Sequence, residues 1–277
     1  MGNMDKEIIK QMRKDIFITG YKGGMAHLAS CYSCLEILYV LYMKKIMSYR
    51  TDNPKWQDRD RLILSKGHAG LALFRVMAEV GLLSMDTFGL YLKDGSDIGG
   101  EPCMRDVSGI EATTGSLGHG LSIGVGIALA NKMDGTSAHV YVILGDGELG
   151  EGSVWEAAMS AAQFKMDNLT AILDCNGIQK MDTTENVMGI SDWRNRWSSF
   201  GWAIKEVDGH DVERLQTVLS EPFVTNKPKL IIAHTVKGKG VSIMENNPNW
   251  HFKLPESKKE MRCFMQELGV KEEELGI

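Results

Sequence analysis

Cysteine is scarce in this sequence. The 277 residues contain five cysteines, too few and too unevenly spaced for a framework of disulfide bonds. Only Cys31 and Cys34 form a C-x-x-C pair, and they lie in the apolar stretch LASCYSCLEILYVLY without flanking strand signals. Because a buried cysteine usually acts as a small hydrophobic residue, we expect packing rather than redox chemistry from this pair. The other cysteines form no second pair that would offer a zinc site.

Long hydrophobic runs and an excess of positive charge are also missing. No apolar segment reaches the length of a membrane span, and the N-terminal residues lack the apolar core of a signal peptide. The formal net charge of −5 gives no reason to expect nucleic acid or an anionic membrane as a partner. Repeats and Gly/Ser-rich linkers are not found, so we expect no internal domain boundary. These observations predict a cytoplasmic globular protein.

The sequence is instead rich in alternating strand and helix patterns. The segment RDRLILSKGHAGLALFRVMAEVGLL goes from a short strand through a glycine turn into a helix. Further strands are expected at 138–145, 169–176, 202–209 and 228–236, and helices at 5–18, 33–47, 119–133, 152–165 and 211–223. This alternation predicts an α/β fold, with a mainly parallel sheet flanked by helices.

Two polar residues follow buried strands of this predicted sheet. Asp146 comes directly after the strand at 138–145, in LGDGELGEGSVWEAAM, and Asn176 ends the next strand. Ligands of such sheets bind beyond the carboxyl ends of the strands, and Mg²⁺ takes oxygen ligands together with phosphates. Gly147 allows close backbone approach, and the N-terminus of the next helix favours an anion. Gly-Asp-Gly and Asn-Gly are also common turns, so both interpretations remain open on these residues alone.

Several motifs in the same order resemble the transketolase family, in its N-terminal, diphosphate-binding portion. GDG followed 30 residues after its aspartate by NGI is the thiamine diphosphate motif. The likeness covers about residues 7–255, through SKGHAGLALF, GIEATTGSLGHGLSIGVGIALA, GDGELGEGSVWEAAM, DNLTAILDCNGIQ, FGWAIKEVDGHD and AHTVKGKGVSIMENNPNWH. The resemblance implies one thiamine diphosphate-binding domain over residues 1–277. It also implies a transketolase-type transferase that moves a two-carbon ketol unit from a ketose to an aldose.

The resemblance assigns the metal and the diphosphate to particular residues. Asp146, Asn176 and the main-chain carbonyl of Ile178 would hold Mg²⁺, or Ca²⁺ or Mn²⁺ in its place. Gly145 and Gly147, on either side of the aspartate, would contact the diphosphate of the cofactor, thiamine diphosphate. These assignments follow from the family motif and add to what the strand ends indicate.

The resemblance also implies roles around the rings of the cofactor and the substrate. Gly115 in TTGSLG would accept a hydrogen bond from the aminopyrimidine, and Leu117 would support the bent shape of the cofactor. His68 in SKGHAG and His251 in NWHFK match family histidines near the diphosphate and the substrate. His27 in GGMAHLAS matches the histidine beside the hydroxyls of the donor sugar. The three histidines are therefore candidate catalytic residues.

Acidic residues give one further match and one departure. Glu151 and Glu156 match family residues that link paired active sites across a subunit interface, and as N-terminal acids they would also complement a helix dipole. In IGGEPCMRDVSGIEATTG, Glu101 stands where transketolases usually carry a histidine that faces the substrate. A carboxylate accepts hydrogen bonds where an imidazole can donate one, so Glu101 puts the identity of the sugars in question. The KGKG segment at 237–240 is either a phosphate-facing turn or a flexible loop.

A second subunit is expected from the same resemblance. In the family, a glutamate of a separate pyrimidine-binding domain completes catalysis, and the segment 257–277 is too short to form such a domain. We therefore expect a partner chain that carries the pyrimidine-binding and C-terminal domains, in a heterotetramer of two copies of each chain. The substrates would be sugar phosphates, and no nucleic acid or membrane is expected among the partners.

Four alternatives to an ordinary transketolase are considered. The nearest are an enzyme like 1-deoxyxylulose-5-phosphate synthase, because of HLAS, and a ketol transferase for a specialised sugar, because of Glu101. Dehydrogenase-type α subunits share GDG and the later asparagine, but TGSLGHGLS and TVKGKGVSIMENN favour transketolase. A non-catalytic cofactor-binding relative is the last alternative, and the intact Asp146, Asn176 and His68 argue against it.

Overall fold

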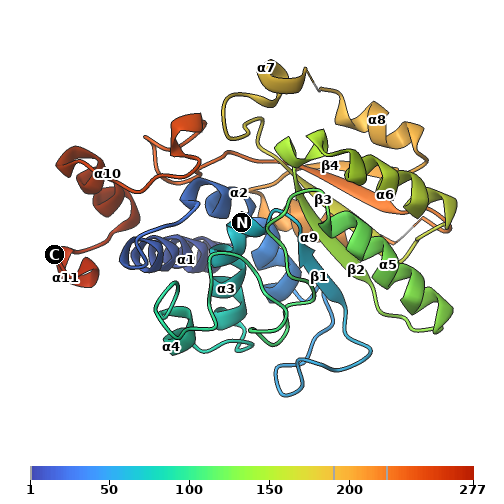
Figure 1. The fold of residues 1–277 in the computed structure, drawn as a ribbon, viewed down its shortest axis with the longest axis horizontal. Coiled ribbons are helices and arrows are strands. Elements are labelled where there is room, and N and C mark those ends of the chain that lie inside the picture. The colour runs from blue at the N-terminus through green and yellow to red at the C-terminus, as the bar shows by residue number, and fades with distance from the viewer. Residues whose placement is uncertain (1, 190, 223) are drawn as a thin grey trace.

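A single parallel sheet forms the centre of the computed structural model, which describes residues 2–189, 191–222 and 224–277 (Figure 1). Its strands run in the order β1-β2-β3-β5-β4, and every neighbouring pair is parallel. The strands are β1 (Arg61–Leu64), β2 (Val140–Gly145), β3 (Leu169–Cys175), β4 (Ala203–Asp208) and β5 (Lys229–His234). The predicted α/β fold with a mainly parallel sheet is confirmed.

Helices cover both faces of this sheet, with α5 and α6 on one side and α1, α2 and α3 on the other (Figure 1). The longer helices are α1 (Asn3–Lys22), α2 (Leu28–Met43), α3 (Gly70–Glu79), α5 (Gly120–Met133), α6 (Gly152–Gln163), α9 (Val212–Ser220) and α10 (Lys258–Leu268). The short helices are α4 (Met85–Phe88), α7 (Thr184–Met188), α8 (Trp193–Ser199) and α11 (Glu272–Leu275). The 3₁₀ turns of the described residues are η1 (Gly67–Ala69), η2 (Gly147–Gly150) and η3 (Pro248–Trp250).

The two-sided cover explains why β2 reads as an unbroken apolar run. Tyr141 and Ile143 point into the core under α1, α2, α3 and α9, whereas Val142 and Leu144 point into the core under α5, α6 and α8. Successive side chains of a strand face opposite sides, so both sets must be apolar when both faces are buried. The unbroken apolar run therefore indicates that β2 lies in a sheet covered on both faces.

Several helix boundaries differ from those expected from the sequence. The helix expected at 33–47 begins at Leu28, and its first fifteen residues are all buried. The helix expected at 211–223 ends at Ser220, because Glu221 precedes Pro222 and takes an extended conformation, as residues before proline usually do. Residue 223, the last of that expected helix, lies outside the described residues.

The C-x-x-C pair lies within α2 and both of its thiols are free and buried. Burial raises the pKa of Cys31 and of Cys34 to about 12, which disfavours the thiolate that redox chemistry needs. This agrees with the packing role expected for the pair.

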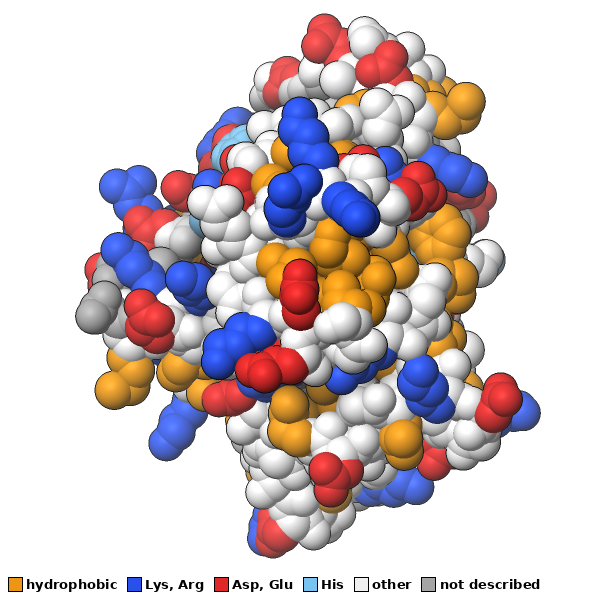
Figure 2. Space-filling model, turned by 90° about the vertical axis from the view of Figure 1, so that its left-hand side faces the viewer, with side chains coloured by type: hydrophobic (Ala, Val, Ile, Leu, Met, Phe, Trp, Pro, Cys, Tyr) orange, Lys and Arg blue, Asp and Glu red, His pale blue; other side chains and the backbone are white. Residues whose placement is uncertain are grey.

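The surface shows mixed charge on the side that Figure 2 presents, where basic and acidic side chains are interspersed around a hydrophobic area. Within the described residues, no helix is both long and apolar enough to cross a membrane.

Candidate functional site

A pocket of about 440 Å³ opens at the carboxyl ends of β2 and β3. Its lining includes most of the residues selected from the sequence, which come from distant parts of the chain: His27, His68, Glu101, Gly115, Leu117, Gly145, Asp146, Gly147, Asn176, Ile178 and His251. Parallel strands end at the same edge of a sheet, so residues that follow them converge there. The fold thus brings these residues together.

The side-chain oxygen atoms of Asp146 and Asn176 lie in this pocket. Asp146 is buried, and its carboxylate accepts hydrogen bonds from the main-chain N–H groups of Gly147 at 2.9 Å and Gly177 at 2.5 Å. The side-chain oxygen of Asn176 accepts from the N–H of Ile178 at 3.1 Å, which turns the chain tightly after β3. Burial and the nearby carboxylate of Asp174 raise the pKa of Asp146 to about 6. A carboxylate in this setting is stabilised by a cation.

The donor set fits a hard divalent ion. One carboxylate, one amide oxygen and one main-chain carbonyl are oxygen ligands, the kind that Mg²⁺ and Ca²⁺ take. Across the described ranges, no group of three or more His, Cys, Asp or Glu side chains is arranged to hold a metal. An ion at Asp146 would therefore need the asparagine, the carbonyl and oxygen atoms from a bound ligand, as phosphates can supply.

Glycines around the pocket stand where a side chain would collide with a neighbouring segment. A Cβ atom on Gly147 would lie 2.6 Å from the Cβ of Gln179. A Cβ atom on Gly115, whose φ is +140°, would overlap the carboxylate of Glu101. A Cβ atom on Gly67 would lie 2.6 Å from the main-chain nitrogen of Gly115. Only glycine allows these loops to approach so closely, which leaves main-chain groups available to a ligand.

Three histidines form a cluster at the side of the pocket. The ring centroids of His27 and His68 are 5.1 Å apart, those of His27 and His251 5.3 Å, and those of His68 and His251 5.5 Å. Burial and the positive charges of three lysines, Lys237, Lys66 and Lys180, lower the pKa of His27 to about 4 and that of His251 to about 3. Burial also lowers the pKa of His68. All three imidazoles are therefore neutral near pH 7, and each can donate one hydrogen bond and accept another.

A buried ion pair that the sequence did not suggest lies beneath the pocket. Lys66 and Asp174 have 2% and 0% of their side chains exposed and form a direct ion pair. Ser33 donates to the same carboxylate at 2.6 Å, and Thr235 donates to its other oxygen. Lys66 passes over Gly145, the residue of β2 paired with Asp174, and a side chain there would stand within 3.9 Å of it. The sequence did contain one indication of this ion pair, because Asp174 is a carboxylate inside the apolar run LTAILDC and would need a buried partner.

A second carboxylate that the sequence analysis missed ties three segments together. Glu148 is 2% exposed and accepts hydrogen bonds from the N–H of Gly118 at 2.8 Å, from the N–H of Gly145 at 3.1 Å and from the hydroxyl of Ser65. Ser65 in turn accepts from the N–H of Gly120 at 3.1 Å. The segments joined in this way carry His68, Leu117 and Asp146. Glu148 therefore fixes the relative positions of the pocket walls.

Replacing Glu148 with glutamine should lower the free energy of unfolding by about 1–3 kcal/mol, because the amide NH₂ would face a main-chain or hydroxyl donor and leave it unsatisfied. Chemical denaturation of the two proteins measures this. Glu7→Gln on the exposed side of α1 is the matched control and should change stability by less than about 0.5 kcal/mol. Equal stability of Glu148→Gln and the control would contradict the role given to this carboxylate.

The two lysines of the KGKG segment at 237–240 differ, and only one of them fits the interpretation as a phosphate-facing turn. Lys237 is 3% exposed, lines the pocket and donates to the main-chain oxygen of Ile178 at 3.0 Å. Its ammonium also lies 3.0 Å from Nδ1 of His251. Burial, together with the positive charge of Lys66, lowers the pKa of Lys237 to about 8. Lys239 instead faces Glu245 at 3.7 Å, outside the pocket lining. The first lysine thus faces the pocket and the second does not.

Glu101 lies where the pocket meets solvent. Its carboxylate packs directly against the α-carbon of Gly115, and partial burial raises its pKa. Glu101, which replaces the histidine that transketolases usually carry, is therefore part of the pocket wall.

Two selected residues do not reach this pocket. Glu151 lies at the N-terminus of α6, with its Cβ against the turn at Gly118, and Glu156 lies one turn further along the helix. Both side chains are exposed. Their predicted link between paired active sites concerns a second chain, and it stays a prediction.

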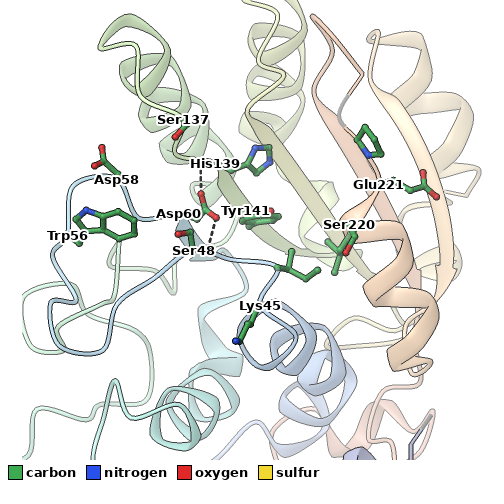
Figure 3. A pocket seen from close by; sticks show the side chains of 13 residues that line it. Lys45, Ser48, Trp56, Asp58, Asp60, Ser137, His139, Tyr141, Ser220 and Glu221 are labelled. Atoms are coloured by element: carbon green, nitrogen blue, oxygen red, sulfur yellow. Dashed lines mark hydrogen bonds between the residues drawn. The ribbon is translucent and has the colours of Figure 1, made fainter.

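A larger hollow of about 650 Å³ lies at the opposite, amino end of the sheet (Figure 3). Asp60 stands in its wall and accepts hydrogen bonds from the main-chain N–H groups of Ser48 at 2.8 Å and His139 at 2.7 Å. Trp56 and Tyr141 also line it (Figure 3). None of the residues selected from the sequence lies there, so the larger volume does not mark the candidate site.

Comparisons with known proteins agree on one family. The family model described as "Transketolase, thiamine diphosphate binding domain" matches residues 5–277. The chain is 44% identical over 244 residues to one subunit of the apulose-4-phosphate transketolase of Phocaeicola vulgatus, and the match covers 88% of this chain and 86% of that protein. It is 37% identical over 225 residues to one subunit of the 6-deoxy-6-sulfo-D-fructose transketolase of a Clostridium species, where the match covers 81% of this chain and 82% of that protein.

A solved structure gives the same fold. A transketolase from Pichia stipitis superposes on 98% of this chain with a TM-score of 0.88 and 28% sequence identity. The match covers 41% of the Pichia chain. This chain therefore spans about two fifths of that protein, whereas it spans most of the two subunits named above.

Proposed function

This chain belongs to the transketolase family, and on that premise we propose that residues 1–277 form the diphosphate-binding domain of a two-subunit transketolase. The enzyme transfers a two-carbon ketol unit from a ketose phosphate to an aldose phosphate. The observation that carries the proposal is the convergence of the metal motif, the glycine turns and three neutral histidines in one pocket at the carboxyl edge of the sheet.

Asp146, Asn176 and the carbonyl of Ile178 are the proposed metal ligands, with Mg²⁺ as the physiological ion and Ca²⁺ or Mn²⁺ as substitutes. Gly145 and Gly147 line the pocket beside them, and their lack of side chains leaves room for a diphosphate. When bound, thiamine diphosphate supplies the nucleophilic carbon and the electron sink that ketol transfer needs. This chain binds the cofactor, orients it and excludes water from its reactive end.

The ring end of the cofactor would lie against Gly115 and Leu117. The main-chain carbonyl of Gly115 is the proposed acceptor for the aminopyrimidine, and the side chain of Leu117 is the proposed support between the two rings. Glu148 holds the N–H of Gly118 in this loop and that of Gly145 beside the metal ligand. One carboxylate thereby links the loop that would hold the ring end to the strand end that would hold the diphosphate.

His27, His68 and His251 are the proposed groups for handling substrate hydroxyls and protons. Their low pKa values keep the imidazoles neutral, so each ring can accept a proton or a hydrogen bond at one nitrogen and donate at the other. His27 is the proposed contact to the donor sugar, with His68 and His251 nearer the diphosphate. The ring separations of 5.1–5.5 Å show that the three imidazoles pack against one another, so that they form one patch of the pocket wall that a small ligand can contact.

A partner subunit is part of the proposal, since the relatives named above are themselves subunits. We assign it the pyrimidine-binding and C-terminal domains and an assembly of two copies of each chain. Glu151 and Glu156 are exposed on α6 and are the proposed link to the paired active site. A cytoplasmic location stays a prediction.

Capture of the full chain from an extract of its host, with thiamine diphosphate and Mg²⁺ present, tests this proposal. We expect a chain with a pyrimidine-binding domain to copurify, and the mixture to transfer ketol units between sugar phosphates only when both chains and the cofactor are present. A purified pair that binds the cofactor without transferring any ketol unit would favour the non-catalytic alternative.

A specialised sugar phosphate is the second candidate substrate class, favoured by the names of two relatives and by Glu101. Glu101→His should change the ratio of kcat/KM between two donor sugars by about 10-fold or more, because it replaces an acceptor of hydrogen bonds by a donor in the pocket wall. Glu101→Gln, which keeps an acceptor oxygen and the side-chain length, should give a smaller change. Steady-state kinetics with a panel of ketose phosphates measures both, and an unaltered donor profile in Glu101→His would remove this position from specificity.

A further inference from the structure

The ammonium of Lys237 lies at one of the proposed metal ligands. It donates to the main-chain oxygen of Ile178 at 3.0 Å, and its charge interacts with the carboxylate of Asp146. That carbonyl and that carboxylate are two of the three groups assigned to the metal. Without a metal, the lysine therefore supplies positive charge to the same oxygen atoms.

The backbone around Lys237 is held on both sides. The N–H of Val236 donates to Nε2 of His210 at 2.8 Å, and the N–H of Gly238 donates to the main-chain oxygen of Ala29 at 3.0 Å. The main-chain oxygen of Lys237 accepts from the N–H of Asn246 at 2.9 Å. Any movement that takes the ammonium away from Ile178 must therefore come from the side chain.

The charge of Lys237 is poorly compensated. The neighbouring Lys66 forms a direct ion pair with Asp174, whereas no carboxylate of the described residues forms an ion pair with Lys237. Its direct polar contacts are the carbonyl of Ile178 and the neutral imidazole of His251, whereas the carboxylate of Asp146 acts on it from beyond ion-pair distance. A divalent cation that entered beside it would meet a second positive charge in a buried setting, where charges are weakly screened. A diphosphate, with several negative charges, could pair with both cations.

We propose that Lys237 makes metal binding depend on the diphosphate. In the empty pocket its ammonium holds the carbonyl of Ile178 and repels a lone divalent ion. When metal and diphosphate arrive together, the side chain turns from the carbonyl to a phosphate oxygen, and the carbonyl becomes available to the metal. This inference rests on the proposed function, because it takes the metal ligands from there.

The test is calorimetric titration of the full chain with Mg²⁺ alone, at pH 7 and without cofactor. Lys237→Met removes the charge but keeps an unbranched side chain, so it should bind Mg²⁺ about 10-fold or more tightly than the unmodified chain, by removal of one repulsive charge. The same variant should bind thiamine diphosphate more weakly at saturating Mg²⁺. Lys239→Met, two residues along and outside the pocket, is the matched control and should change neither affinity.

Lys237→Arg keeps the positive charge, and it should bind Mg²⁺ alone as weakly as the unmodified chain. Equal or weaker Mg²⁺ binding by Lys237→Met would overturn the inference while leaving the metal ligands and the proposed function in place. Absence of Mg²⁺ binding in every variant, also with thiamine diphosphate present, would overturn both the inference and the metal assignment. Thermal unfolding of each variant shows whether the fold is retained.

Discussion

Asp146→Asn should weaken Mg²⁺-dependent binding of thiamine diphosphate by about 100-fold or more, since even residues that only support metal ligands typically change affinity by about 10–100-fold. The substitution keeps the shape of the side chain and removes its charge. Asp146 provides the single carboxylate of the proposed donor set, and it is buried. Titration with thiamine diphosphate at fixed Mg²⁺, followed by protein fluorescence, measures the affinity.

The control for this substitution is Asp134→Asn, at the exposed C-terminal end of α5. It changes the net charge by the same amount and should leave cofactor binding unchanged. The metal assignment would be lost if Asp146→Asn bound thiamine diphosphate as well as the control did at every Mg²⁺ concentration. A loss of binding that persists without any metal would point to a disturbed pocket instead.

Lys66→Met should lower the free energy of unfolding by about 3–5 kcal/mol, because it leaves Asp174 buried without its counter-charge. Lys205→Met removes an ion pair with Glu221 whose side chains are 49% and 36% exposed, and it should cost less than about 1 kcal/mol. Chemical denaturation at pH 7 compares the two. Similar losses of stability in both variants would show that the buried Lys66–Asp174 pair stabilises the fold no more than the exposed Lys205–Glu221 pair does.

The pH dependence of Lys66→Met gives an independent check. Burial alone would raise the pKa of Asp174, but Lys66 and two hydroxyl groups hold it below its usual value. The ionised carboxylate therefore stabilises the unmodified chain above the unfolded pKa, and this contribution is lost as the pH falls through the lower folded pKa. In Lys66→Met only the two hydroxyl groups still oppose the effect of burial on Asp174, so protonation of this carboxylate reduces the cost of burying it. The stability difference between the two proteins should shrink as the pH falls below about 5.

The sheet was predictable because its strands are covered on both faces. Val140 to Leu144 form an unbroken apolar run that ends at a glycine, and such runs are typical of buried parallel strands. The start of α2 was not predictable to the residue, since a helix buried all round has no polar stripe to mark its limits. Its N-terminal residue His27 also lacks a side-chain cap, the usual local signal for a helix start.

The parts of the pocket nearest to strand ends were also predictable. Asp146 and Asn176 follow neighbouring strands, and parallel pairing brings them to one edge. Glu148 was missed because η2, a short 3₁₀ turn, directs it inward ahead of α6, whereas the sequence pattern shows only a glycine-rich start of a helix. The Lys66–Asp174 pair was missed because it depends on the order β1-β2-β3, which brings the residue after β1 near the end of β3.

The hydrogen bonds of Glu148 have a consequence for protein engineering. One carboxylate joins Ser65, Gly118 and Gly145, which are separated by dozens of residues along the chain. If only one of these segments were replaced by the corresponding segment of a relative, the new segment would lack the matching hydrogen bonds to the other two. Loop exchange or recombination among such subunits should treat the three segments as one inherited block, with crossover points chosen outside it.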